Sequence, residues 1–172
     1  MTTLLLGDSL TAWNDWQNVV GTHLNHALPG ESTDGLLYRL HRSLSAAPER
    51  VILLIGTNDL LQHTPVEMVI HNYTQILSEL LEVKQLFVLS VPPVAAGVQT
   101  AEVNAAINTF NAWLQEQLWK YGFKYVDLHT ALSDPSGGID PRCTTDGIHL
   151  TPEGYARWET LLAEAIEAAD SE

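Results

Sequence analysis

Short apolar runs alternate with amphipathic stretches along the sequence, and this alternation constrains the fold more than any other feature. Residues 51–55 are apolar at every position, as a strand covered on both faces by helices requires. Shorter runs at residues 3–6, 86–89 and 125–126 are separated by stretches with helical spacing. The pattern predicts a parallel sheet covered by helices.

Helices are expected between these strands and after the last one. Apolar residues recur at helical spacing in residues 36–44, 69–80 and 103–118. A final helix is predicted to begin with Thr151 as N-cap and Pro152 in its first turn. A short edge strand is expected at residues 24–28. No repeat or linker interrupts the pattern, so residues 1–172 are predicted to form one domain.

Charge and cysteine content narrow the classes of partner. The formal net charge is -13, from 21 acidic and 8 basic residues, which disfavours nucleic acid and anionic membrane surfaces. Cys143 is the only cysteine, so no intrachain disulfide is expected. The N-terminal residues lack a signal-like pattern, and no apolar run approaches membrane-spanning length. These features favour a cytoplasmic protein with a small-molecule substrate.

Three polar clusters fall where predicted strands or loops reach the carboxyl edge of the sheet, which is where ligands bind in such folds. The first contains Gly7, Asp8 and Ser9, directly after the first strand. The second, residues 56–59, follows the central strand, and the third, residues 146–149, precedes the last helix. Their convergence predicts a site at that edge.

Ser9, His149 and Asp146 have the chemistry of a nucleophile, its base and a carboxylate that orients the base. Serine needs a base to become nucleophilic at neutral pH, and the Asp-x-x-His spacing lets both side chains serve it. Considered alone, Ser9 is more simply interpreted as a helix cap, and Asp146 and His149 as residues of a solvated loop. Asn58 is a candidate oxyanion donor or a turn residue, and Asp59 is assigned mainly a structural role.

The ordered set of motifs resembles the SGNH hydrolase superfamily, also called GDSL esterases and lipases. Residues 7–10 read Gly-Asp-Ser-Leu, residues 56–59 match the Gly-x-Asn-Asp block, and residues 146–150 match the last block. Gly30 lies where the oxyanion glycine of the family would be. The resemblance covers essentially the whole chain.

This resemblance implies a three-layer α/β/α, flavodoxin-like domain with about five parallel strands. It further implies an ester hydrolase with Ser9, His149 and Asp146 as catalytic residues. The oxyanion would be held by the N–H groups of Ser9 and Gly30 and by the Asn58 amide. No metal or cofactor is expected, because these groups supply nucleophile, base and oxyanion donors by themselves.

Apolar residues beside the clusters are the candidates for substrate binding. They are Leu10, Trp13, Leu60, Pro93, Val94 and Ile148. The apolar loop 91–98 is interpreted either as a wall of the acyl pocket or as a segment that packs on its own domain or on a second subunit. These surroundings favour a neutral ester with a short or medium acyl chain.

Several alternatives remain open from the sequence. The enzyme could be a lipase-like carboxylesterase, a thioesterase or a carbohydrate acetyl esterase. Asp8, Asp59 and Asp146 could instead bind Mg²⁺ for phosphoryl transfer, which would leave Ser9 and His149 without linked roles. A non-catalytic binding module is the third class.

Overall fold

The centre of the molecule is a five-stranded parallel sheet. The structure, a computed structural model, describes residues 1–95 and 99–172. The strand order is β2-β1-β3-β4-β5, and every neighbouring pair is parallel. The strands are β1 (Thr3–Gly7), β2 (His23–Asn25), β3 (Arg50–Leu54), β4 (Gln85–Leu89) and β5 (Lys124–Val126). Every residue of β1 and β3 is buried, because helices cover both faces.

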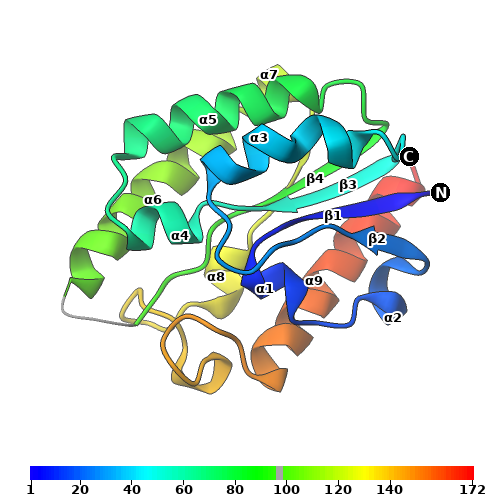
Figure 1. Cartoon of the computed structure of the whole chain (residues 1–172). Coiled ribbons are helices and arrows are strands. Elements are labelled where there is room, and N and C mark those ends of the chain that lie inside the picture. The colour runs from blue at the N-terminus through cyan, green and yellow to red at the C-terminus, as the bar shows by residue number, and fades with distance from the viewer. Residues whose placement is uncertain (96–98) are drawn as a thin grey trace.

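The helices form a layer on each side of the sheet (Figure 1). On one side α3 (Thr33–Leu44), α5 (Val66–Glu79) and α6 (Thr100–Glu116) pack together. On the other, α2 (Gln17–Val20) and α8 (Leu128–Leu132) pack against α9 (Pro152–Asp170). The remaining short elements are α1 (Ser9–Ala12), α4 (Thr57–Leu61), α7 (Leu118–Tyr121) and the 3₁₀ helix η1 (Pro141–Cys143). The predicted three-layer α/β/α fold is confirmed. Of the helices in the described ranges, none is long and apolar enough to cross a membrane.

The edge of the sheet shows how far the predicted elements agree with the observed ones. The expected edge strand at residues 24–28 is present as β2, parallel to β1, although the regular strand ends at Asn25. The Asn25 side chain accepts a hydrogen bond from the N–H of Ala27, which forms a turn there. Backbone pairing nevertheless continues, because the N–H groups of His26 and Leu28 donate to carbonyls of β1.

The strand order also fixes where a site can form. In a sheet of order 2-1-3-4-5, the chain leaves the neighbouring strands β1 and β3 in opposite directions, and a crevice opens outside their carboxyl ends. Gly7 and Leu54, near the ends of these two strands, are directly paired. The segments with Ser9 and Asn58 therefore begin side by side.

Candidate active site

Ser9 is presented at the sharp turn between β1 and α1. Asp8 is the N-cap of α1, and its carboxylate accepts a hydrogen bond from the N–H of Leu10 at 2.9 Å. The turn is tight: a Cβ on Gly7 would lie 2.5 Å from Oγ1 of Thr11 and 2.6 Å from the carbonyl oxygen of Leu54. Glycine is thus required at position 7. Ser9 is placed at the first position of the helix and remains 8% exposed.

Asp146 and His149 lie on the loop before α9 and are fixed to each other. One oxygen of Asp146 accepts hydrogen bonds from the backbone N–H groups of Ile148 (2.9 Å) and His149 (2.7 Å), while the other lies 2.5 Å from Nδ1 of His149. Partial burial opposes ionisation of Asp146, but these hydrogen bonds prevail and lower its pKa to about 2. Asp146 is therefore a carboxylate at neutral pH.

The imidazole of His149 joins this loop to Ser9. Its Nε2 lies 3.1 Å from Oγ of Ser9, so hydroxyl, imidazole and carboxylate form a continuous hydrogen-bonded line. Trp13 packs on the same ring in a tilted arrangement, with 4.5 Å between ring centroids and 32° between planes. An ionised carboxylate only accepts hydrogen bonds, so the proton is assigned to Nδ1, and Nε2 is free to accept the proton of Ser9.

The segment with Gly30 is tied to α4. The Asn58 side-chain amide donates to the carbonyl oxygen of Glu31 at 2.9 Å. Next to it, buried Asp59 accepts hydrogen bonds from both the N–H and the hydroxyl of Thr33. Burial raises the pKa of Asp59 despite these bonds. An amide has two N–H donors, so Asn58 keeps one beyond the bond that holds this segment.

The carboxyl group of Asp8 is buried directly beneath Ser9. It is 1% exposed, and within the described residues its second oxygen has no hydrogen-bond partner. Burial raises the pKa of Asp8 from 3.8 to about 6. The folded state therefore favours the protonated form, and the ionised form destabilises the fold.

A pH-dependent stability difference is expected from Asp8. Because its pKa is higher in the folded state, the stability of wild type should fall as the pH rises from about 4 through 6, reaching a cost of about 3 kcal/mol at pH 7. The side chain of the Asp8→Asn variant cannot ionise. The free energy of unfolding of this variant relative to that of wild type should therefore increase by this amount between pH 4 and pH 7. Urea unfolding at pH 4, 5.5 and 7 measures the difference. A difference that is constant across this range would contradict ionisation of Asp8 in the fold.

The apolar candidates for substrate binding occupy two kinds of environment. Leu10, Leu60 and Val94 are packed in the core at 1% exposure, and Pro93 is also buried. Ile148 is half-buried, whereas Trp13 is 57% exposed. Of these side chains, Trp13 therefore offers the largest free surface beside His149. Their role in substrate binding stays a prediction.

The described part of loop 91–98 packs down on its own domain. Val91 and Val94 are buried, and each has both backbone groups bonded to an asparagine of α6, Asn111 and Asn104 respectively. The N–H of Ala95 donates to the carbonyl of Gly147, which links this loop to the one with Asp146. Residues 96–98 lie outside the described part. Asn104 and Asn111 were not anticipated from the sequence, although they interrupt an apolar helical stripe at a spacing of seven.

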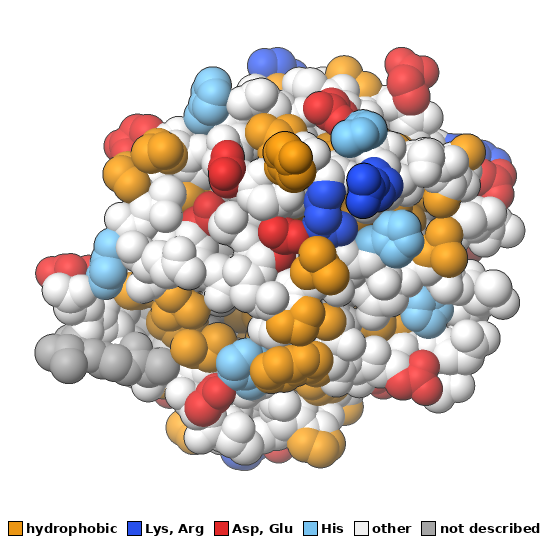
Figure 2. Space-filling model, viewed as in Figure 1, with side chains coloured by type: hydrophobic (Ala, Val, Ile, Leu, Met, Phe, Trp, Pro, Cys, Tyr) orange, Lys and Arg blue, Asp and Glu red, His pale blue; other side chains and the backbone are white. Residues whose placement is uncertain are grey.

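The surface around the hydrogen-bonded line is apolar and hollowed. Figure 2 shows hydrophobic side chains gathered on this face, over the end of α1 and the loop after β4. Trp13 also borders a cavity of about 430 Å³, together with Asn14, Tyr155 and Glu159. The Asn14 amide donates to the Glu159 carboxylate at 2.8 Å. Within residues 1–95 and 99–172, no group of three or more His, Cys, Asp or Glu side chains is arranged to hold a metal ion.

The structure has a doubly wound sheet with a serine, a histidine and a carboxylate in one hydrogen-bonded line at its switch point, an arrangement that serine hydrolases also have. The chain belongs to the GDSL-like lipase/acylhydrolase family, whose model matches residues 5–157.

Several known proteins resemble this chain in fold or in sequence. The lipase/acylhydrolase from Enterococcus faecalis superposes with a TM-score of 0.82 at 21% identity, covering 98% of this chain and 97% of its own. An acetylxylan esterase from Geobacillus stearothermophilus gives 0.76 at 16% identity, covering 96% and 91%. At these identities the likeness shows the fold alone. N-acylneuraminate cytidylyltransferases from Streptococcus agalactiae are 28% identical over 150 residues, 87% of this chain but 35% of theirs. The chain thus spans about a third of the length of these relatives.

Proposed function

We propose that this enzyme hydrolyses neutral esters with short or medium acyl chains, with Ser9 as nucleophile. The observation that carries the proposal is the line from Oγ of Ser9 through His149 to the carboxylate of Asp146. His149 takes the proton of Ser9 as Oγ attacks the ester carbonyl, and Asp146 stabilises the resulting imidazolium. The imidazolium then protonates the leaving alcohol, and water releases the acyl group from Ser9 by the same steps. We further propose a cytoplasmic location, because a single cysteine implies no oxidising compartment.

The oxyanion of the tetrahedral intermediate is assigned to the N–H groups of Ser9 and Gly30 and to the Asn58 amide. Ser9 begins α1, so its N–H has no intrahelical acceptor and lies at the positive end of the helix. The bond from Asn58 to Glu31 supports this role, because it fixes the amide next to the segment with Gly30. Gly30 itself is exposed and has a positive φ of 80°.

A panel of nitrophenyl esters from acetate to octanoate tests both the substrate range and the oxyanion donors. In wild type, kcat/KM is expected to peak at short or medium chains, since each buried methylene contributes about 0.8 kcal/mol only until the pocket is filled. Asn58→Ala should lower kcat by about 100-fold for every ester, because the oxyanion is common to all of them. The chain-length profile should keep its shape. Hydrolysis of anionic esters alone would contradict the proposed substrate, and a loss confined to some chain lengths would contradict the role of Asn58.

A second candidate substrate is an acetylated carbohydrate. Trp13 presents an exposed aromatic face beside His149, and the adjoining cavity has the amide of Asn14 and the carboxylate of Glu159. An aromatic face combined with such polar groups suits a sugar ring and its hydroxyls. The names of the acetylxylan esterase and the N-acylneuraminate enzymes also refer to sugars. Including an acetylated xyloside and a thioester in the same panel distinguishes these substrates from simple esters.

A further inference from the structure

The residues on either side of Asp146 and His149 are joined into a narrow neck. We refer to residues 142–151 as the catalytic loop. At its ends, the hydroxyl of Thr151 donates to the carbonyl of Arg142 at 2.6 Å, and the N–H of Thr151 donates to the carbonyl of Cys143 at 3.0 Å. The next pair inward, Thr144 and Leu150, forms a β-bridge. The tip with Asp146 and His149 therefore takes its position from this neck.

The two polar side chains at the tip are partly exposed. The side chain of Asp146 is 50% exposed and that of His149 is 31% exposed. Thr144 braces the tip from within, because its hydroxyl donates to the carbonyl of His149 and accepts from the N–H of Gly147. These bonds keep the loop rigid but do not attach it to the domain. The tip is attached to the domain by the bond from the N–H of Ala95 to the carbonyl of Gly147 and by the packing of Trp13 on His149, and the neck attaches the two ends of the loop.

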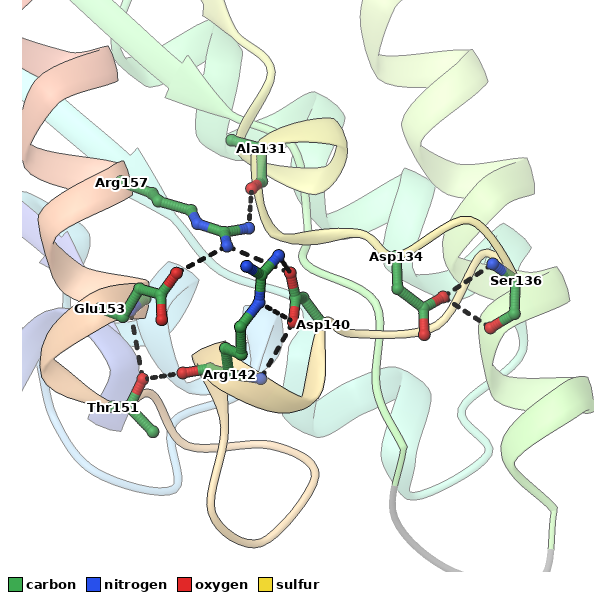
Figure 3. A network of polar contacts seen from close by, with 9 residues as sticks. Ala131, Asp134, Ser136, Asp140, Arg142, Thr151, Glu153 and Arg157 are labelled. Atoms are coloured by element: carbon green, nitrogen blue, oxygen red, sulfur yellow. Dashed lines mark hydrogen bonds and ion pairs between the residues drawn. The ribbon is translucent and has the colours of Figure 1, made fainter.

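Asp140 lies just before the neck and binds two arginines. Its carboxylate accepts hydrogen bonds from the Nε, Nη2 and backbone N–H of Arg142, and from Nη2 of Arg157 at 3.1 Å. Figure 3 shows the two guanidinium groups converging on Asp140, whereas Asp134 pairs with Ser136 some distance along the same segment. The side chain of Asp140 is 8% exposed and that of Arg157 is 28% exposed, whereas the side chain of Arg142 is 70% exposed.

The partners of Asp140 belong to different parts of the fold. Arg142 is in η1 at the first end of the catalytic loop, and Arg157 is in α9, which follows the second end. Arg157 also donates to the carbonyl of Ala131 in α8 and pairs with Glu153. Hydrogen bonds from the side chain of Arg142, and to a smaller extent from its backbone N–H, keep the pKa of Asp140 well below its usual range. The carboxylate therefore stays charged. Asp140 thus joins η1 to α9, and Arg157 extends this connection to α8.

We infer that Asp140 is a positioning residue for ester hydrolysis, and this inference rests on the proposed roles of Ser9, His149 and Asp146. By holding Arg142 to Arg157, its carboxylate fixes the neck of the catalytic loop against α9. The neck in turn keeps Nε2 of His149 within hydrogen-bond distance of Oγ of Ser9. Asp140 takes no part in the chemical steps.

Asp140→Asn tests the inference, with Asp134→Asn as the matched control on the same segment. Asp134 bonds locally to Ser136 and to the backbone of that turn, and it makes no bond to the catalytic loop among those described. Asp140→Asn is expected to lower kcat for nitrophenyl acetate by about 10- to 100-fold with little change in KM, because a displaced base loses rate steeply. Labelling of Ser9 by a fluorophosphonate should slow by the same factor. Both rates are measured well below the melting temperature, and Asp134→Asn should match wild type.

A double-mutant comparison separates positioning from general destabilisation. If Asp140 acts through Asp146 and His149, Asp140→Asn should slow labelling much less in an Asp146→Asn background than in wild type. Equal losses in both backgrounds would overturn the inference, as would an Asp140→Asn enzyme as active as the Asp134→Asn control. If Asp140→Asn does not fold, Arg157→Gln should give a smaller loss of the same kind, and full activity there would overturn the inference. A Ser9→Ala enzyme that stays active would instead refute the proposed function.

Discussion

Ser9→Ala is expected to lower kcat by about 10⁵- to 10⁶-fold, the largest effect of any substitution considered for this enzyme. Without Oγ there is no nucleophile for His149 to activate, and only oxyanion stabilisation and binding remain. The fold should tolerate the change, because Asp8 caps α1 and the Ser9 side chain contributes no backbone cap. Hydrolysis of nitrophenyl acetate and labelling by a fluorophosphonate measure the loss.

Ser78→Ala serves as the matched control for this substitution. The Ser78 hydroxyl is exposed on α5 and donates to the carbonyl of Thr74, so it lies outside the proposed machinery. This variant should be labelled and should hydrolyse esters at the rate of wild type. Undiminished labelling of Ser9→Ala would mean that another residue is the nucleophile, and the proposed mechanism would be wrong.

Asp146→Asn is expected to lower kcat by about 10⁴-fold. An amide can donate to Nδ1 of His149, which would place the imidazole proton on Nε2 and leave no acceptor for the proton of Ser9. The neutral side chain would also fail to stabilise an imidazolium. The amide oxygen can still accept the N–H bonds of Ile148 and His149, so the loop should keep its shape. Steady-state kinetics and circular dichroism together separate loss of chemistry from loss of fold.

Asp15→Asn is a control matched to Asp146 in local structure. Asp15 accepts a bond from the N–H of Gln17 at 3.0 Å, the same two-residue turn that Asp146 makes with Ile148. It has no bond to His149 among the described contacts. Asp15→Asn should therefore retain activity. Comparable losses in the two variants would show that the turn, and not the carboxylate facing the imidazole, accounts for the effect.

The sheet and the proximity of Ser9 to His149 were predictable from sequence for different reasons. The run at residues 51–55 had to be a central strand because it is apolar on both faces, and the structure has it as β3. Ser9 and His149 are 140 residues apart, and the ordered motifs brought them into one site before any geometry was known. Short helices such as α1 and α4 contain too few residues to show a period.

Tertiary contacts explain what the sequence could not provide. Leu10 and Leu60 flank the motifs, and both are buried. The sequence alone does not distinguish an apolar residue that lines a pocket from one that fills the core. Asn104 and Asn111 fasten the loop after β4 through its backbone, which no spacing rule anticipates. The contact between Asp140 and Arg157 was also not predictable, because the two residues meet only when α9 packs against α8.

The separation of Ser9 and His149 along the chain has a consequence for how activity arises during folding. The strand before Ser9 is synthesised long before the loop that supplies the imidazole, and α9 follows that loop. Closing so long a loop is among the entropically costly steps of folding, so it is expected to be slow and late. The proposed esterase activity is therefore expected to recover, after dilution from denaturant, only when α9 has docked. A nascent chain should likewise lack this activity until that helix packs on the sheet.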